Sequence, residues 1–187
     1  MNQKIIKKNY LVWMDLEMSG LDPEKNVILE MSALVTDEDL NVIAQGPEIV
    51  ISQDATLFAT MDDWNQKHHT ASGLWDSVLE STVKSHAAEE QMLGFLGQYV
   101  KPRESPLCGN SVWQDRRFIA KHMPRLDQFL HYRLIDVSTL KELVRRWYPK
   151  DFANLPRKEE KHRALDDILE SVEELKRYRT LVFKPVG

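Results

Sequence analysis

The sequence is poor in several residues and patterns, and each shortage excludes a class of protein. Only one of its 187 residues is a cysteine, Cys108, so neither an internal disulfide nor a cysteine-based zinc cluster can form. No apolar run approaches the length of about 18 residues that spans a bilayer. Residues 1–9 lack the apolar core of a secretion signal. We therefore expect a cytoplasmic protein without a membrane segment.

The sequence also has no excess of basic residues. Its net charge of −4 provides no overall positive field for nucleic acid, which counts against a protein that binds a long duplex. A short anionic substrate held by a metal ion and a few donors is not excluded. The sequence has no internal repeat, and its length and 42% hydrophobic content suit one domain over residues 1–187, with residues 1–9 as a flexible extension.

The most informative stretch is residues 10–17, Tyr-Leu-Val-Trp-Met-Asp-Leu-Glu, which is apolar until it ends in two acids. Its aromatic and branched side chains predict a buried strand, in which Asp15 and Glu17 point to the same side, about 6.6 Å apart. Two neighbouring carboxylates repel each other unless a cation lies between them, and oxygen donors suit Mg²⁺ or Mn²⁺. The alternative is a strand that runs into solvent with two exposed acids.

Hydrophobic periodicity and turn residues predict the other elements. Strands at 27–36 and 42–51, the second interrupted by Gly46-Pro47, form an antiparallel meander with the first strand. Shorter strands are predicted at 105–109 and 132–137, helices at 85–100, 111–123 and 163–181, and a loop at 149–161. A further helix is predicted to begin at Asp136, Ser138 or Thr139, with Thr139 and Glu142 as a capping box, and to bury Leu140, Leu143, Val144 and Trp147.

An acid interrupts the apolar stripe of the helix at 111–123. Asp115 lies three residues after Val112 and four before Ile119, so it points to the core with them. An inward acid is costly unless it is paired or bound to a metal ion. Pairing with Arg116 or Arg117 is the alternative, although neighbours in a helix point elsewhere.

The last helix carries two adjacent acids on different faces. Its core stripe consists of Leu165, Ile168, Leu169, Val172 and Leu175. Asp166 joins a solvent stripe, whereas Asp167 shares a face with the small residues Ala164 and Ser171, to which another group can come close. The pattern therefore favours Asp167 as the functional acid. His162 precedes it by five residues, and its alternative interpretation is an ordinary surface histidine.

Phosphoryl transfer by two metal ions requires a set of acidic ligands. The sequence offers Asp15, Glu17, Asp115 and Asp167, accompanied by His162. In that chemistry one ion positions the attacking water and the other stabilises the leaving oxygen. A histidine near neutrality can take the proton of the water.

These acids also stand in a familiar order. Asp-x-Glu near the start, Asn110-Ser-Val-Trp-Gln-Asp115 in the middle and His162-x-Ala-x-x-Asp167 near the end resemble the histidine-bearing branch of the DEDD exonuclease superfamily. Four further segments resemble the oligoribonuclease family within it, along nearly the whole chain: Trp13-Met-Asp-Leu-Glu-Met-Ser-Gly-Leu21, His69-Thr-Ala-Ser-Gly-Leu74, Cys108-Gly-Asn-Ser111, and Tyr132-Arg133 through Asp136-Val-Ser-Thr139.

The resemblance implies a ribonuclease H-like α/β fold, with a mixed sheet flanked by helices. It implies a homodimer that removes nucleotides from the 3′ end of RNA of about two to five nucleotides, dinucleotides above all, with two Mg²⁺ or Mn²⁺ ions. Leu21 and Trp64 would wedge and stack on bases. The 5′ phosphate would be capped by Ser111, Arg133, Ser138 and Thr139, with His69 near it and Tyr132 reaching across from the partner subunit.

The sequence leaves two alternative functions open. A histidine-type DEDD exonuclease that acts on DNA would carry the same acids and histidine, and only the flanking segments and an assay of substrate length separate it. A non-catalytic ribonuclease H-like binding scaffold would have lost its acids, whereas here all four are present.

Overall fold

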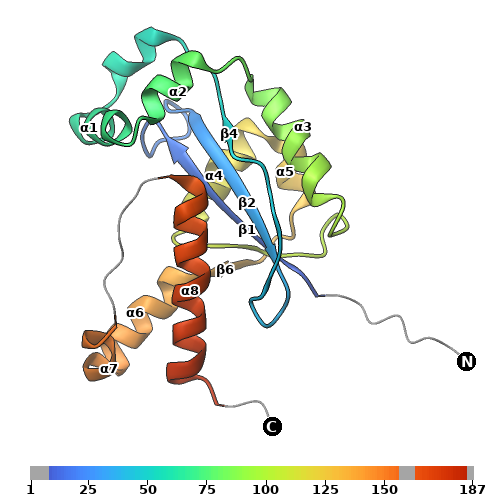
Figure 1. Ribbon diagram of the computed structural model, residues 1–187, viewed down its shortest axis with the longest axis vertical. Coiled ribbons are helices and arrows are strands. Elements are labelled where there is room, and N and C mark those ends of the chain that lie inside the picture. The colour runs from blue at the N-terminus through green and yellow to red at the C-terminus, as the bar shows by residue number, and fades with distance from the viewer. Residues whose placement is uncertain (1–8, 156–162, 185–187) are drawn as a thin grey trace, which may run out of the picture.

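A mixed six-stranded sheet forms the centre of the molecule, in a computed structural model that describes residues 9–155 and 163–184 (Figure 1). Its strands follow the order β3-β2-β1-β5-β6, and β4 also pairs with β2. Their bounds are β1 Leu11–Met18, β2 Ile28–Thr36, β3 Val42–Gln45, β4 Ile49–Val50, β5 Leu107–Gly109 and β6 Leu134–Asp136. The first strands pair in antiparallel fashion, whereas β5 and β6 are parallel to β1 and to each other. The predicted meander with added parallel strands is confirmed.

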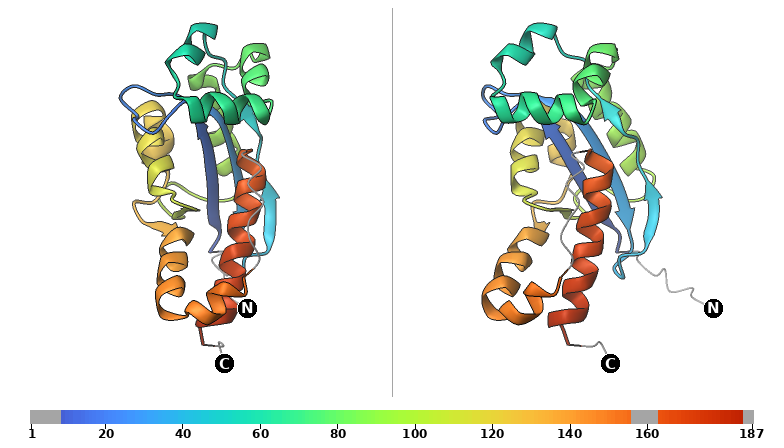
Figure 2. Two further views of the ribbon diagram at one scale, coloured as in Figure 1. Left: turned by 90° about the vertical axis from the view of Figure 1, so that its left-hand side faces the viewer. Right: turned by 60° about the vertical axis from the view of Figure 1, so that its left-hand side comes forward.

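Helices cover both faces and one end of this sheet (Figures 1 and 2). Their bounds are η1 Ala55–Thr60, α1 Asp63–Ala71, α2 Leu74–Glu80, α3 Ser85–Leu96, α4 Trp113–His122, α5 Pro124–Phe129, α6 Val137–Trp147, α7 Pro149–Ala153 and α8 Ala164–Val182. Figure 1 shows α8 running along one face, α3 and α5 beyond the other, and α1 and α2 at the end where β1 finishes.

The alternation of side chains along β1 decides which residues reach the site. Val12, Met14 and Leu16 point to the core that contains α3, α4 and α5. Trp13 points the other way, into the core formed with α6 and α8. Asp15 and Glu17 follow Trp13 at intervals of two, so they face the start of α8.

Helix α8 confirms the face predicted for Asp167 and corrects part of its apolar stripe. Ile168 and Val172 are buried against the sheet, and Ser171 is buried beside Asp167 as expected. Leu169, predicted to be in the core, is 37% exposed. The buried side of the helix is rotated toward Ser171, Glu174 and Tyr178, so Leu169 lies beyond its border.

The segment around α6 and α7 differs most from expectation. The predicted loop at 149–161 begins with the helix α7, and its residues from 156 lie outside the described part of the chain. The side chain of Asp136 caps α6 by accepting the Ser138 N–H, so the capping box of Thr139 and Glu142 does not form. Trp147 is 67% exposed instead of buried, because none of the elements in the described part of the chain covers that end of α6.

Within residues 9–155 and 163–184, none of the helices is long and apolar enough to cross a bilayer.

Candidate active site

Three of the four predicted acids come together where β1 ends and α8 begins. One carboxylate oxygen from each of Asp15, Glu17 and Asp167 lies within 4.8 Å of the other two. The strand supplies the first two from alternate positions, and the first turn of the helix supplies the third (Figure 1). Residues remote in sequence thus form one group of partly buried carboxylates.

The donor set fits a divalent metal ion. Carboxylate oxygens are the ligands that Mg²⁺ and Mn²⁺ prefer, and a spacing below 5 Å allows one ion to contact all three groups. Burial, and then the negative charges of Asp167, Glu30 and Asp115, raise the pKa of Glu17 to about 8, although the Arg163 guanidinium opposes this. A carboxyl that holds its proton at neutral pH marks a place where a cation would bind favourably.

Asp115 is buried beside this group but is held differently. Its Oδ1 accepts the backbone N–H of Leu16 at 3.0 Å, which ties α4 to β1 between the two strand acids. Arg116 binds Asp127 and Arg117 binds Gln114, so the alternative pairing within the helix is wrong. Burial raises the pKa of Asp115, and the Leu16 hydrogen bond opposes this shift. The negative charge of Asp115 contributes to the raised pKa of Glu17, so Asp115 lies close enough to influence the three-acid group.

The raised pKa of Glu17 predicts how the metal-free protein responds to pH. The folded state binds this proton more tightly than the unfolded chain, whose glutamate has a pKa of 4.5. The contribution of Glu17 to stability in chelator is therefore greatest below pH 4.5, and it should fall as the pH rises from there to about 8. Melting temperatures in chelator across this range measure the fall. Glu17→Gln should flatten the curve, and an equal slope in both proteins would contradict the prediction.

His162 lies outside the described residues, and its role remains a prediction from the sequence.

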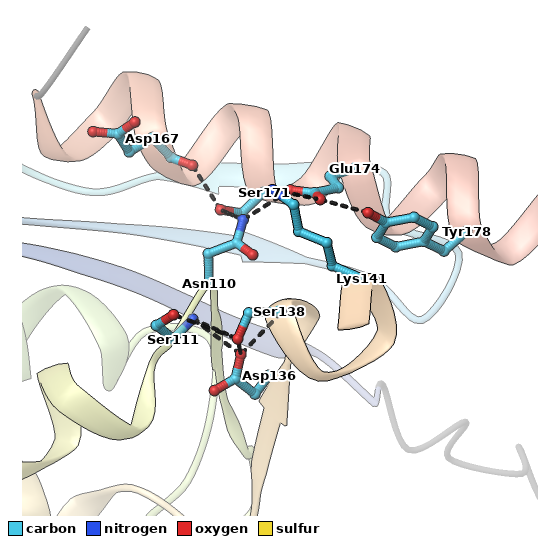
Figure 3. A network of polar contacts seen from close by, with 9 residues as sticks. All are labelled: Asn110, Ser111, Asp136, Ser138, Lys141, Asp167, Ser171, Glu174 and Tyr178. Atoms are coloured by element: carbon cyan, nitrogen blue, oxygen red, sulfur yellow. Dashed lines mark hydrogen bonds and ion pairs between the residues drawn. The ribbon is translucent and has the colours of Figure 1, made fainter. Parts of the chain in front are cut away.

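The residues predicted to cap a phosphate meet where β5 and β6 end. Asp136 Oδ1 accepts the Ser111 N–H at 2.9 Å and the Ser138 hydroxyl at 2.6 Å, and the two serine hydroxyls are 3.4 Å apart (Figure 3). Ser111 has a φ of 50°, a strained conformation for a residue other than glycine. Thr139 follows on the exposed side of α6. Ser111, Ser138 and Thr139 therefore lie on one polar edge, and their contact with a phosphate stays a prediction.

A polar chain ties this edge to α8. The side-chain amide of Asn110 donates to the Ser171 hydroxyl at 2.8 Å and to Glu174 at 3.1 Å (Figure 3). Ser171 in turn donates to the backbone carbonyl of Asp167 at 2.8 Å. Glu174 also accepts the Tyr178 hydroxyl at 2.6 Å, which holds the carboxylate in place. The segment that bears Ser111 is thereby fixed to the helix that bears Asp167.

The predicted base-contacting residues occupy the end of the sheet near α1. Leu21 is 71% exposed on the loop after β1, and its carbonyl accepts a hydrogen bond from Gln114 at 2.6 Å. Trp64 is 55% exposed and stacks on the ring of His68 at 3.8 Å. Apolar and aromatic surfaces are thus presented here, as base stacking requires.

His69 is placed differently from its neighbours on α1. It is only 1% exposed, and its Nε2–H donates to the carbonyl of Met18 at 2.9 Å, just after the strand acids. A contact with a phosphate, as the resemblance implied, remains a prediction.

Tyr132 and Arg133 stand on the surface just before β6. The Tyr132 side chain is 74% exposed, and the Arg133 guanidinium lies 5.5 Å from the centre of its ring. An exposed aromatic ring and a cation are thus presented at the start of β6, the strand whose other end bears the polar edge.

Three residues near the site were given no role by the sequence. Glu30 and Arg163 form an ion pair beside Glu17, and Asn110 bridges to α8. For Glu30 the available signal was an acid within a strand rich in apolar residues. For Asn110 and Arg163 no local pattern pointed to their partners.

Comparisons with known proteins point to one family of enzymes. The family model RNase_T, described as exonuclease, matches residues 12–175. The chain is 52% identical to oligoribonuclease of Dichelobacter nodosus over 177 residues, or 95% of this chain and 97% of that protein. It is 54% identical to oligoribonuclease of Pseudomonas aeruginosa over 169 residues, covering 90% and 93%. Mitochondrial oligoribonuclease of Mus musculus is 53% identical over 174 residues, covering 93% and 73%.

Solved structures share the fold at low identity. The Mg²⁺- and Mn²⁺-bound form of S. pombe Pop2p superposes with a TM-score of 0.68 at 13% identity, covering 96% of this chain and 86% of that one. Exonuclease I from Methylocaldum szegediense gives a TM-score of 0.60 at 16% identity, covering 94% and 41%. The expected ribonuclease H-like fold is confirmed.

The fold and the clustered acids together define a ribonuclease H-like exonuclease, a hydrolase of phosphodiester bonds that depends on divalent metal. Its close similarity to the relatives above, along nearly the whole chain, narrows the class further. The chain belongs to the oligoribonuclease family and is an exoribonuclease.

Proposed function

We propose that this exoribonuclease hydrolyses very short RNA, dinucleotides above all, from the 3′ end and releases nucleoside 5′-monophosphates. The observation that carries the proposal is the group of three carboxylates within 4.8 Å, in a molecule that also presents a polar edge of serine hydroxyls and an exposed aromatic surface. The single buried cysteine suits the reducing conditions of the cytoplasm, where we place the activity.

Asp15, Glu17 and Asp167, with Asp115 beside them, would hold two divalent ions, Mg²⁺ or Mn²⁺. When bound, these ions supply a positioned nucleophile and stabilise charge on the scissile phosphate. Asp115 keeps β1 in place through its bond to Leu16, so the two strand acids cannot shift independently. We assign His162, from its sequence motif, the role of general base that takes the proton of the attacking water.

The other residues select the substrate. Leu21 and Trp64 would wedge and stack on bases. Stacking tolerates any RNA sequence, because every base has an aromatic face. A 5′ phosphate would be held by Ser111, Ser138, Thr139 and Arg133. His69, whose ring is bonded to the Met18 carbonyl, would lie near this phosphate. A cap that closes behind the 5′ phosphate excludes longer strands.

A homodimer would complete this cap. Large aromatic side chains are exposed on α4, before β6 and at the end of α6: Trp113 at 53%, Tyr132 at 74%, Trp147 at 67% and Tyr148 at 42%. Aromatic residues in such number are typical of a protein interface. In a two-fold dimer, Tyr132 would reach the site of the partner subunit.

An assay on 5′-labelled RNA of graded length tests the proposal. With Mg²⁺, dinucleotides should be cleaved much faster than long strands, and chelator should stop the reaction. Light scattering on the same sample should give the mass of a dimer. DNA of matched length serves as the control for the alternative substrate. Equal rates on short and long RNA, or full activity in an obligate monomer, would contradict the closed site.

Arg133→Ala should weaken binding of substrates that carry a 5′ phosphate most. A charge-assisted hydrogen bond is worth roughly 1.5–3 kcal/mol, which corresponds to a loss of about 10- to 150-fold. The comparison is between dinucleotides with and without the 5′ phosphate, measured by binding. Arg103→Ala, which removes a different exposed arginine, is the matched control. If Arg133→Ala weakened both dinucleotides equally, Arg133 would not contact that phosphate.

A further inference from the structure

Glu30 is a buried acid with an unusual set of partners. It lies on β2, it is only 1% exposed, and the register of the sheet places it directly opposite Glu17. Its Oε1 accepts Arg163 Nη2 at 2.6 Å, and Arg163 Nε lies 3.1 Å from both carboxylate oxygens. Its Oε2 also accepts the backbone N–H of Ala164 at 3.2 Å. Both oxygens of Glu30 are thus engaged with the start of α8.

Helix α8 lacks a cap of its own. The N-cap residue is Arg163, whose side chain makes no capping hydrogen bond to the helix. The first N–H groups of a helix need acceptors, and a negative charge there is favourable. Glu30 supplies both from a strand that is 133 residues away in sequence. The first turn of α8 is therefore fixed by the sheet and not by its own sequence.

The position of this contact matters for the site because Asp167 belongs to the same turn. The Asp167 N–H donates to the carbonyl of Arg163 at 3.1 Å, the first hydrogen bond of the helix. Asp167 also has to bring its carboxylate within 4.8 Å of Asp15 and Glu17. Two opposed glutamates on neighbouring strands repel each other, and the Arg163 guanidinium between them offsets that repulsion.

We propose that Glu30 is a positioning residue of the metal centre, which anchors α8 through Arg163 and Ala164 and thereby places Asp167 against Asp15 and Glu17. Glu30 acts through the helix and is not a ligand, since its oxygens are taken by these donors. This inference rests on the metal centre proposed above.

Calorimetric titration of the full chain with Mn²⁺ and with Mg²⁺, in the absence of RNA, tests the role. Glu30→Gln keeps the shape and an acceptor for the Ala164 N–H but loses the charge that holds Arg163. Loss of a residue that orients a ligand typically lowers metal affinity about 10- to 100-fold, and we expect a loss in this range. Asp39→Asn is the matched control, because it breaks the ion pair of 2.8 Å between Asp39 and Arg179, near the other end of α8. It should leave metal affinity unchanged.

Two further variants keep the outcomes distinct. The double variant Glu30→Gln/Arg163→Gln should have the same metal affinity as the single variant with the lower affinity. Both substitutions break the same contact, so their effects should not add. Arg163→Lys, which keeps the charge and loses the planar fork, replaces Glu30→Gln if that protein does not fold. Unchanged affinity in the single variants would overturn the inference, as would complete loss of binding in Glu30→Gln, which would make Glu30 a ligand. If Asp167→Asn bound metal normally, the metal centre itself would be wrong.

Discussion

Replacing Asp15 with asparagine is expected to abolish RNA hydrolysis and to leave the fold intact. The amide has the shape of the carboxyl group but no charge, and Asp15 is one of three acids whose oxygens lie within 4.8 Å of one another. A metal ion contributes several kcal/mol to the stabilisation of transition-state charge, so we expect a loss of about 10³-fold or more in kcat/KM. Rates on a labelled dinucleotide, with circular dichroism to verify the fold, provide the measurement.

The adjacent acids of α8 provide a control for this prediction. Asp167→Asn should resemble Asp15→Asn, because Asp167 belongs to the three-acid group, whereas Asp166→Asn should be nearly silent. The two variants remove the same charge from neighbouring positions. Full activity of Asp15→Asn, or of the native protein in chelator, would refute metal dependence through these acids. Equal losses in Asp166→Asn and Asp167→Asn would point to a general effect of charge on the helix.

Replacing His162 with alanine is expected to lower kcat by about 10²- to 10⁴-fold, the usual contribution of a positioned general base. In the sequence, His162 precedes by five residues Asp167, an acid of the proposed metal centre at the start of α8. Because proton transfer occurs in the transition state, KM should change little. Single-turnover rates on a dinucleotide, compared with its binding affinity, separate the two quantities.

Metal binding distinguishes the base from a ligand. His162→Ala should bind Mn²⁺ as the native protein does in calorimetry, unlike Asp167→Asn. If metal binding were lost, His162 would be a ligand and the assignment would be wrong. A native value of kcat would mean that another group takes the proton. His86→Ala, which removes an exposed ring that pairs with Glu90 within α3, controls for the loss of an imidazole.

The sequence by itself determined which side chains point toward the site. The alternation of side chains in β1 placed Asp15 and Glu17 on one face, and the helical period placed Asp115 inward and Asp167 on the small-residue face. These predictions needed only the local geometry of a strand or a helix. The same rule failed for Trp147, because a helical stripe does not say whether another element is present to cover it.

Only the tertiary structure decided which residues meet. Three contacts follow from strand register and from how α8 lies on the sheet. Asp115 accepts the Leu16 N–H, Asn110 reaches Ser171, and Glu30 caps the start of α8. Such contacts join residues from about 60 to more than 130 positions apart, and many pairings are compatible with the same periodicity. The pairing is selected by the packing of the whole core, because burying an acid such as Glu30 is tolerable only where that packing also brings its partners.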